Sequence, residues 1–348
     1  MLSNFSSNVI LAKARAMYGR RLTKKNYSDL LNCQNVSEIA RYLVNNTDYA
    51  KILSGINDRD IYRGQLENLL KQKLFEDSAV LCRYEFSVGD IFSGYLLQRS
   101  EIEQILNVLL HLTAGMPSEY LFSMPMFLTN RSRINLVSLS DAKSFDDILN
   151  ALGGTPYRAL LEPLRPQAGM PLDYTAAENA LYTHLYGEVY EIIRRRTHGE
   201  TKKQLLEIFD TFLDLTNYIR IIRLKTYFHS GYDFIRNSLL PFGTLRENQI
   251  NDLIAAQSTS QIRQAMEQTS VGKRTRNIQH NFTDQISSRA IYHVCRHSIH
   301  FSSRPSVVML SYIFLTQLEL MDIINIVEGI RYKLPANEIK KLLTFADF

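Results

Sequence analysis

Apolar residues along this chain recur at the spacing of amphipathic helices. After Thr23, a residue type that caps helices, apolar side chains stand at i, i+3 and i+4, namely Tyr27, Leu30 and Leu31. The same spacing returns in the segment 39–43. No segment shows the strict alternation of a half-buried strand. The pattern therefore predicts a chain of helices joined by short turns.

One mixed apolar and polar pattern occurs three times. The segment Glu319–Val327 matches Glu101–Leu109 in its carboxylate, its asparagine and most of its aliphatic positions, at an offset of 218 residues (319 − 101). A looser copy, Asp214–Ile222, lies 113 residues after the first (214 − 101) and 105 before the third (319 − 214). A steady period of this kind indicates a repeat protein.

A second module repeats as well. Residues 245–262 align without a gap onto residues 22–39, at an offset of 223 (245 − 22), and a weaker copy covers 144–157. Longer apolar helices are predicted near residues 60–113, 174–229 and 281–333. Each repeat would join short helices to the long ones that follow. The predicted repeats are 1–114, 115–230 and 231–348.

The predicted helix around Glu319 is apolar on most sides. Its polar residues recur every three positions, at Glu319, Asp322, Asn325 and Glu328. A helix turns every 3.6 residues, so this spacing gives a narrow polar seam that drifts slowly around the axis. We interpret the seam as structural, with hydrogen bonds that fix the helix among its neighbours. An ion path is the less favoured interpretation, because no membrane-spanning segment is predicted to hold it.

Composition agrees with a helical globular chain. Its 348 residues are 45% apolar and 22% charged, and 15 Gly and 9 Pro are too few for the many turns of a sheet protein. The net charge of +5 is spread over separate basic clusters mixed with acids, so no nucleic-acid surface is predicted. Three widely spaced cysteines are expected to be reduced thiols without a role.

Neither a secretion signal nor a membrane span is predicted. The first residues lack a charged n-region. The longest apolar run, Val307–Leu315, is shorter than the roughly 20 residues that cross a bilayer. A place on a membrane complex remains compatible with this pattern.

A row of histidines is the sharpest candidate for chemistry. His293, His297 and His300 stand at i, i+4 and i+7, on one helical face that could bind zinc in a helical metalloenzyme. The order HExxH is missing and no second cysteine is near, so a packed or surface histidine face is favoured. Gly153-Gly154 is a turn without the Gly-Lys-Ser/Thr of a phosphate loop. We predict no catalytic, cofactor-binding or metal site and no small-molecule substrate.

Apolar joints that contain proline follow the first two pairs of long helices. They occupy equivalent places: Met124, Pro125, Met126 and Phe127 in one, Leu240, Pro241 and Phe242 in the other. Methionine and aromatic side chains beside proline suggest a rim that contacts a protein partner. The alternative is that these residues only fill the junctions between repeats.

Both ends of the chain carry a family resemblance. Residues 12–23 (AKARAMYGRRLT) and 323–335 (IINIVEGIRYKLP) resemble the C subunit of the bacterial and archaeal V/A-type (V-type) rotary ATPases, the counterpart of the d subunit of eukaryotic V-ATPase. The length, the three-unit repeat, the segment 214–223 and Leu240–Gly243 extend the likeness across the whole chain.

This resemblance implies an all-α fold of three similar helical subdomains around a pseudo-threefold axis, shaped like a funnel. It also implies a non-catalytic rotor component with no nucleotide site, peripheral on the cytoplasmic side of the membrane. There it would join the central shaft, made of the D and F subunits, to the membrane proteolipid ring and transmit torque for ATP-coupled ion transport. A helical-repeat adaptor outside any ATPase, or the metalloenzyme above, are the alternatives. The choice of H⁺ or Na⁺, the working direction and the ring size lie in other subunits.

Overall fold

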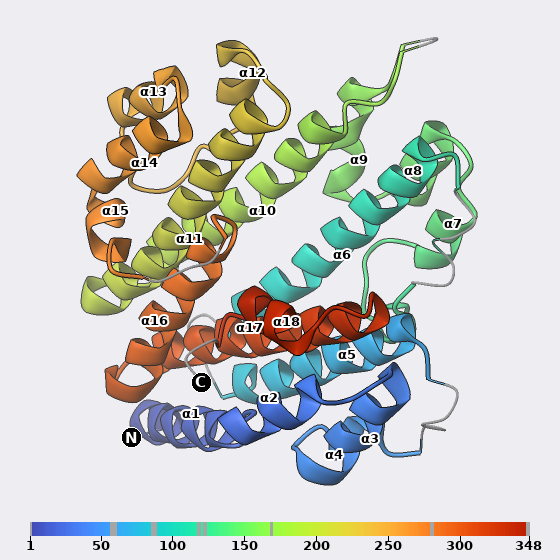
Figure 1. Ribbon diagram of the computed structural model, residues 1–348, viewed down its shortest axis with the longest axis vertical. Coiled ribbons are helices and arrows are strands. Elements are labelled where there is room, and N and C mark those ends of the chain that lie inside the picture. Colours follow the sequence, from blue (N-terminus) through green and yellow to red (C-terminus); the bar gives the residue numbers. More distant parts are fainter. Residues whose placement is uncertain are drawn as a thin grey trace. The chain divides into compact units, whose positions relative to one another are not determined.

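The computed structural model describes residues 2–55, 61–84, 89–116, 120, 124–167, 170–278 and 282–345. These residues form helices and turns, with no strand among them, which confirms the predicted all-α class. They divide into two compact units, residues 1–90 with 193–348 and residues 91–192. Figure 1 labels the helices. The funnel-shaped threefold arrangement and the repeat boundaries at 114 and 230 stay predictions.

The first unit begins with a long helix and a group of short ones. These are α1 (Leu2–Gly19), α2 (Lys24–Leu31), α3 (Val36–Asn46), α4 (Ala50–Leu53) and the longer α5 (Arg63–Cys82). Side-chain caps set two of the starts. Thr23 accepts a hydrogen bond from the backbone N–H of Asn26, and Asn35 accepts one from Glu38. Such caps satisfy N–H groups that have no partner within the helix.

The same unit continues after residue 193 and ends around one central helix. Its elements are α11 (Gly199–Thr226), α12 (Tyr232–Asn237), α13 (Glu247–Ala255), α14 (Thr259–Gln268), α15 (Ser270–Thr275), α16 (Gln285–Phe301), α17 (Pro305–Arg331) and α18 (Ala336–Leu342). Helix α17 contacts α1, α5, α11, α16 and α18. It is therefore the helix around which this unit packs.

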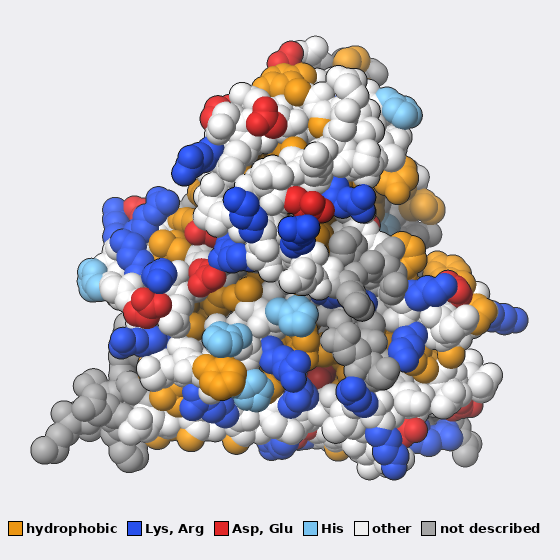
Figure 2. Space-filling model, turned by 60° about the vertical axis from the view of Figure 1, so that its left-hand side comes forward, with side chains coloured by type: hydrophobic (Ala, Val, Ile, Leu, Met, Phe, Trp, Pro, Cys, Tyr) orange, Lys and Arg blue, Asp and Glu red, His pale blue; other side chains and the backbone are white. Residues whose placement is uncertain are grey.

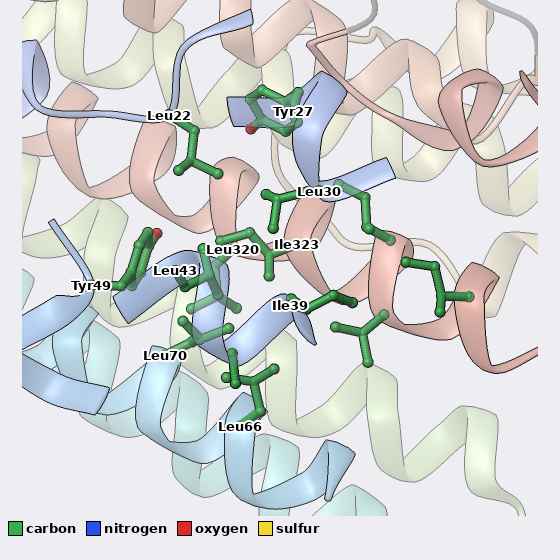
Figure 3. Packing of buried hydrophobic residues seen from close by; sticks show 14 of the residues in the cluster. Leu22, Tyr27, Leu30, Ile39, Leu43, Tyr49, Leu66, Leu70, Leu320 and Ile323 are labelled. Carbon is green, nitrogen blue, oxygen red and sulfur yellow. The ribbon is translucent and has the colours of Figure 1, made fainter. Parts of the chain in front are cut away.

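Segments from opposite ends of the sequence share one apolar core in this unit. Figure 3 shows side chains of α2 and α3 packed against Leu320 and Ile323 of α17, with Leu66 and Leu70 of α5 beside them. Ile323 is fully buried. Burying one such aliphatic side chain contributes about 1.5–3 kcal/mol, so this cluster fixes the first short helices on α17.

Helix α17 is long and apolar enough to cross a membrane by length and composition. Its 27 residues exceed the apolar run counted in the sequence, but 78% of its most apolar window is buried inside the protein. A helix that neighbouring helices cover on most sides is typical of a protein core.

The helix positions repeat as the sequence pattern predicted. Helices α2 and α13 begin 223 residues apart (247 − 24), and α3 and α14 do so too (259 − 36). Pairs of long helices also occupy the three predicted regions, as α5 with α6, α10 with α11, and α16 with α17. The internal repeat of the sequence is thus a repeat of structure.

The second unit places short helices between two long ones. Its elements are α6 (Gly89–Thr113), η2 (Met126–Leu128), α7 (Leu136–Ser140), α8 (Phe145–Ala151), α9 (Pro156–Leu161), η3 (Glu162–Leu164) and α10 (Tyr174–Arg196). Helices α6 and α10 meet where the side-chain amide of Gln98 donates to Glu188, at 2.6 Å. Aromatic packing joins them too, because the rings of Tyr95 and Tyr186 lie 6.5 Å apart.

Candidate functional site

A buried carboxylate on α17 holds the first short-helix module. Glu319 is 7% exposed, and its Oε2 accepts a hydrogen bond from the backbone N–H of Leu22 at 2.8 Å. Its Oε1 accepts the hydroxyl of Tyr49 at 2.9 Å. Hydrogen bonds to a charged group contribute about 1.5–3 kcal/mol, and more is lost when a buried partner is removed. Glu319 therefore fixes two points of the module that are far from it in the sequence.

The equivalent carboxylate of α6 makes the same pair of contacts in the second unit. Glu101 is fully buried and accepts the backbone N–H of Arg133 at 2.6 Å and the hydroxyl of Tyr157 at 2.6 Å. The guanidinium of Arg133 adds an ion pair at 3.1 Å. One backbone N–H and one tyrosine hydroxyl per glutamate define what we call the carboxylate clamp.

The third copy of the clamp uses a shorter acid and no tyrosine. Asp214 of α11 accepts the backbone N–H groups of Thr244 at 2.9 Å and Leu245 at 3.2 Å, and Leu245 is the repeat equivalent of Leu22. The position of the tyrosine is held by the buried Val271, in Thr269-Ser270-Val271. An aspartate reaches less far than a glutamate, so the loss of the tyrosine accompanies the shorter side chain.

A glycine allows the close approach at Asp214. Gly243 has φ +108°, in the region that favours glycine, and a Cβ on it would lie 2.1 Å from Asp214 Oδ1. A larger residue here would both strain the backbone and push the carboxylate away. The glycine of the segment Leu240–Gly243 therefore has a direct reason in the clamp.

One helical turn further along, a second polar residue holds the chain that follows each long helix. Asp322 accepts the backbone N–H groups of Thr344 at 2.8 Å and Phe345 at 3.1 Å. In α11, Asn217 exchanges two hydrogen bonds of 2.9 Å with the backbone of Leu240. In α6, Gln104 accepts the hydroxyl of Tyr120 at 3.1 Å. Each long helix is thus tied both to a short-helix module and to its own exit.

Burial changes the titration of these acids. It raises the pKa of Glu319, against the lowering effect of the hydrogen bonds from Leu22 and Tyr49. Burial raises the pKa of Asp214 too, and hydrogen bonds from Thr244 oppose it. The pKa of Asp322 rises to about 7 for the same reason, although two backbone N–H groups favour its charged form.

The other two residues of the predicted seam are less buried. The side chain of Asn325 is half-buried and donates to the carbonyl of Leu342 at 3.4 Å. Glu328 forms ion pairs with Arg63 at 2.5 Å and Arg331 at 3.0 Å. The seam therefore runs from a buried clamp at Glu319 to a solvated ion pair at Glu328. Its structural role stays a prediction to which these contacts give a form.

The clamps show which module packs on which long helix. The modules held by Glu101 and Asp214 follow those residues in the sequence, whereas Glu319 on the last long helix holds the first module. Sequence analysis joined each module to the long helices that follow it. The tyrosine echo at residues 49 and 157 was the signal that could have revealed the pairing, because it stands at a fixed distance from the clamped N–H. The predicted boundaries themselves stay predictions, since a clamp defines a packing partner and not a domain limit.

Comparison with known proteins decides the family. A model of the ATP synthase (C/AC39) subunit family matches residues 10–342. The chain belongs to this family. The C subunit of the A-type ATP synthase of Methanothermobacter thermautotrophicus is 26% identical over 272 residues, which cover 75% of this chain and 66% of the relative. The same subunit from Pyrococcus abyssi is 25% identical over 268 residues, covering 77% and 69%. The chain thus spans about two thirds of the length of these relatives.

The C/AC39 chain presents only part of its predicted partner rim. Met126 is 69% exposed and Pro241 is also exposed, whereas Met124, Pro125 and Leu240 are buried. Phe127 and Phe242 are half-buried. The buried members pack inside their units, as the alternative interpretation expects of them. Only the exposed pair is placed to contact a partner, and that contact stays a prediction.

The histidine row of the C/AC39 chain lies on the surface of α16. His293, His297 and His300 are exposed, and aromatic rings neighbour them, as where His300 meets Tyr18 at 5.7 Å. Among the described residues, no group of three His, Cys, Asp or Glu side chains is arranged to hold a metal ion. The geometry therefore gives the metalloenzyme alternative no support.

Proposed function

We propose that this chain is the non-catalytic central-stalk subunit of an A/V-type rotary ATPase. In this role it joins the shaft of D and F subunits to the membrane proteolipid ring and turns with both. It sits on the cytoplasmic face of the membrane and transmits torque for ATP-coupled ion transport. The observation that carries the proposal is the family match over residues 10–342, together with relatives named as the C subunit of A-type ATP synthases.

The internal contacts support a mechanical role. A torque-bearing part must resist deformation, and the clamps at Glu101, Asp214 and Glu319 hold modules to long helices through buried, directional hydrogen bonds. Such bonds resist sliding, whereas apolar contacts alone are non-directional. Helices clamped in this way suit a stiff coupling piece.

Co-purification tests the role. The proteolipid ring is tagged in cells with and without this chain, membranes are solubilised gently, and the ring is captured. We expect the D/F shaft to be recovered with the ring only when this chain is present. Recovery of the shaft in its absence would contradict the coupling role, and a captured ring that carries the shaft but never this chain would favour an adaptor outside the ATPase.

A pair of methionines tests the partner rim in the same preparation. Met126 is 69% exposed and Met170 is 65% exposed in the same unit. We expect Met126→Gln to lower the recovery of this chain or of the shaft with the ring several-fold, and Met170→Gln to leave it unchanged. Equal recovery with both variants would assign Met126 to the surface without a partner.

A further inference from the structure

A cavity of about 400 Å³ opens beside the end of α1, within the first unit. Arg21 and Lys24 line it from the α1–α2 connection, Tyr292 and Arg296 from α16, and Tyr27 and Phe345 from α2 and the end of the chain. This volume is at the small end of the range for ligand sites in proteins, about 300–1,000 Å³. The cavity is therefore large enough for a metabolite-sized molecule.

Three of the lining side chains are cations that no described carboxylate neutralises. The guanidinium of Arg21 donates to the carbonyl of Tyr18 and lies 4.3 Å above the Tyr18 ring. Arg296 lies 5.7 Å from the Tyr292 ring. Within the described part of the chain, neither arginine forms an ion pair, and Lys24 forms none. The neighbouring Arg20, by contrast, pairs with Asp48 at 3.5 Å.

No carboxylate among the described residues lines the cavity either. Glu319 and Asp322 lie behind its wall, where their oxygens already accept hydrogen bonds from Leu22, Tyr49 and the chain end. Glu319 still feels the charge of Arg21, which lowers its pKa. On the outer side, His300 has a lowered pKa because of partial burial and then the charges of Arg21, Arg296 and Arg15. The cations around the cavity thus outnumber the acids near it.

The surface view agrees with this concentration of charge. Figure 2 shows pale-blue histidine side chains gathered beside blue Lys and Arg side chains on the face that it turns forward. Positive groups that are not neutralised by the protein attract and retain anions, and arginine forks fit the oxygens of a phosphate.

An aromatic wall completes the cavity. The ring of Phe345 lies 4.8 Å from that of Tyr292 and 5.6 Å from that of Tyr27, between centroids. Aromatic faces of this kind pack against planar rings of ligands. A cavity with cations on one side and aromatic rings on another matches a molecule that carries phosphate and a planar ring.

We propose that this cavity binds a nucleoside phosphate, with phosphate oxygens on Arg21, Lys24 and Arg296 and the base against Tyr292 and Phe345. The family resemblance implied no nucleotide site, so the proposal goes beyond the coupling role and does not rest on it. The ligand is bound and not turned over, because none of the described residues that line the cavity is a carboxylate or a histidine that could act as a general base. Its phosphate chemistry is shared with lipid headgroups, which the experiment separates.

Isothermal titration of the purified full-length chain tests the proposal with ADP, inorganic pyrophosphate and adenosine. We expect one ADP per chain, weaker binding of pyrophosphate, and no binding of adenosine. The double variant Arg21→Gln with Arg296→Gln should lower ADP affinity at least about tenfold, as expected for the loss of two charge-assisted contacts. A matched control, Lys273→Gln with Arg276→Gln, removes the same charge from exposed positions outside the cavity and should bind ADP like the unaltered chain.

Three results would overturn the proposal. One is the absence of binding at millimolar ADP; another is an equal loss of affinity in both double variants, which would mean general charge attraction. The third is binding to phosphatidylglycerol vesicles, lost in the cavity variant, without binding of ADP, which would make the patch a lipid-headgroup site. Circular dichroism of each variant checks that the helices are retained, and co-purification with ring and shaft is scored separately.

Discussion

At the scale of single residues, the chain uses its buried polar groups to bind backbone N–H groups and tyrosine hydroxyls. Glu101, Asp214 and Glu319 are all buried, and each accepts at least two hydrogen bonds. Burying a charge is costly unless it is hydrogen-bonded, so these acids are stable only with their partners in place. The acids therefore specify one arrangement of the modules. They also make stability depend on pH, because burial raises several of their pKa values.

Asp322 gives the clearest pH dependence. Its native pKa is about 7 and its ordinary value is 3.8, so between these values the native state binds the proton more strongly than the unfolded state. The stabilisation from this group is fully present below pH 3.8 and is lost as the pH rises through about 7. We expect Asp322→Asn to flatten the fall of the unfolding free energy between pH 5 and pH 8, measured by urea titration at about half-unit steps.

Some slope should remain in this variant. Burial also raises the pKa of Glu319 and of Asp214, so both acids contribute in the same direction. A slope identical to that of the unaltered chain would show that Asp322 does not titrate in this range.

At the scale of elements, the periodic sequence predicted most of what folds locally. Short helices begin where Thr23, Asn35, Ser144 and Ser258 provide caps, because capping depends on neighbours within four residues. The offset of 223 between modules was legible for the same reason. Sequence periodicity did not reveal which module packs on which long helix, because the contacts of Glu319 span 297 residues to Leu22 and 270 to Tyr49. The cavity was missed since its cations come from segments that only the fold brings together.

The joint between α11 and α13 tests how strictly one clamp constrains its loop. Gly243→Ala would place a Cβ 2.1 Å from Asp214 Oδ1 at a backbone φ of +108°, so the loop or the carboxylate must move. We expect a loss of stability of about 2 kcal/mol or more, from backbone strain and a weakened clamp together. Urea denaturation measures it. Gly231→Ala is the control, because a Cβ there meets nothing within 4 Å, and it should change stability little. Equal effects of the two substitutions would argue against a steric constraint at Asp214.

At the scale of the whole chain, the first module and the last long helix form one packed structure. The apolar core that contains Leu30, Ile39 and Leu43 is completed by Leu320 and Ile323 of α17. The clamp of Glu319 lies at the edge of the same core, through Leu22 and Tyr49. Force applied to the first module is therefore passed to α17 by contacts that do not run along the chain. For a coupling subunit this is useful, because load is shared between segments from both ends of the sequence.

Double-mutant cycles test that connection directly. Tyr49→Phe and Glu319→Gln each remove one side of the hydrogen bond of 2.9 Å between them, so the two losses should not add. We expect a coupling energy of about 1 kcal/mol from urea denaturation, as for other contacting pairs. Tyr157→Phe with Glu101→Gln should behave alike, because the same clamp repeats there at 2.6 Å.

The informative control exchanges the partners. Tyr49 and Glu101 both belong to the predicted repeat 1–114, yet Glu101 has its hydroxyl donor in Tyr157 and Tyr49 has its acceptor in Glu319. Tyr49→Phe with Glu101→Gln should therefore be additive within about 0.5 kcal/mol. Coupling in this exchanged pair, without coupling between Tyr49 and Glu319, would mean that each module packs on the long helices that follow it. The load path from the first module to α17 would then be absent, and the stiffness of the subunit would have to come from contacts between neighbours in sequence.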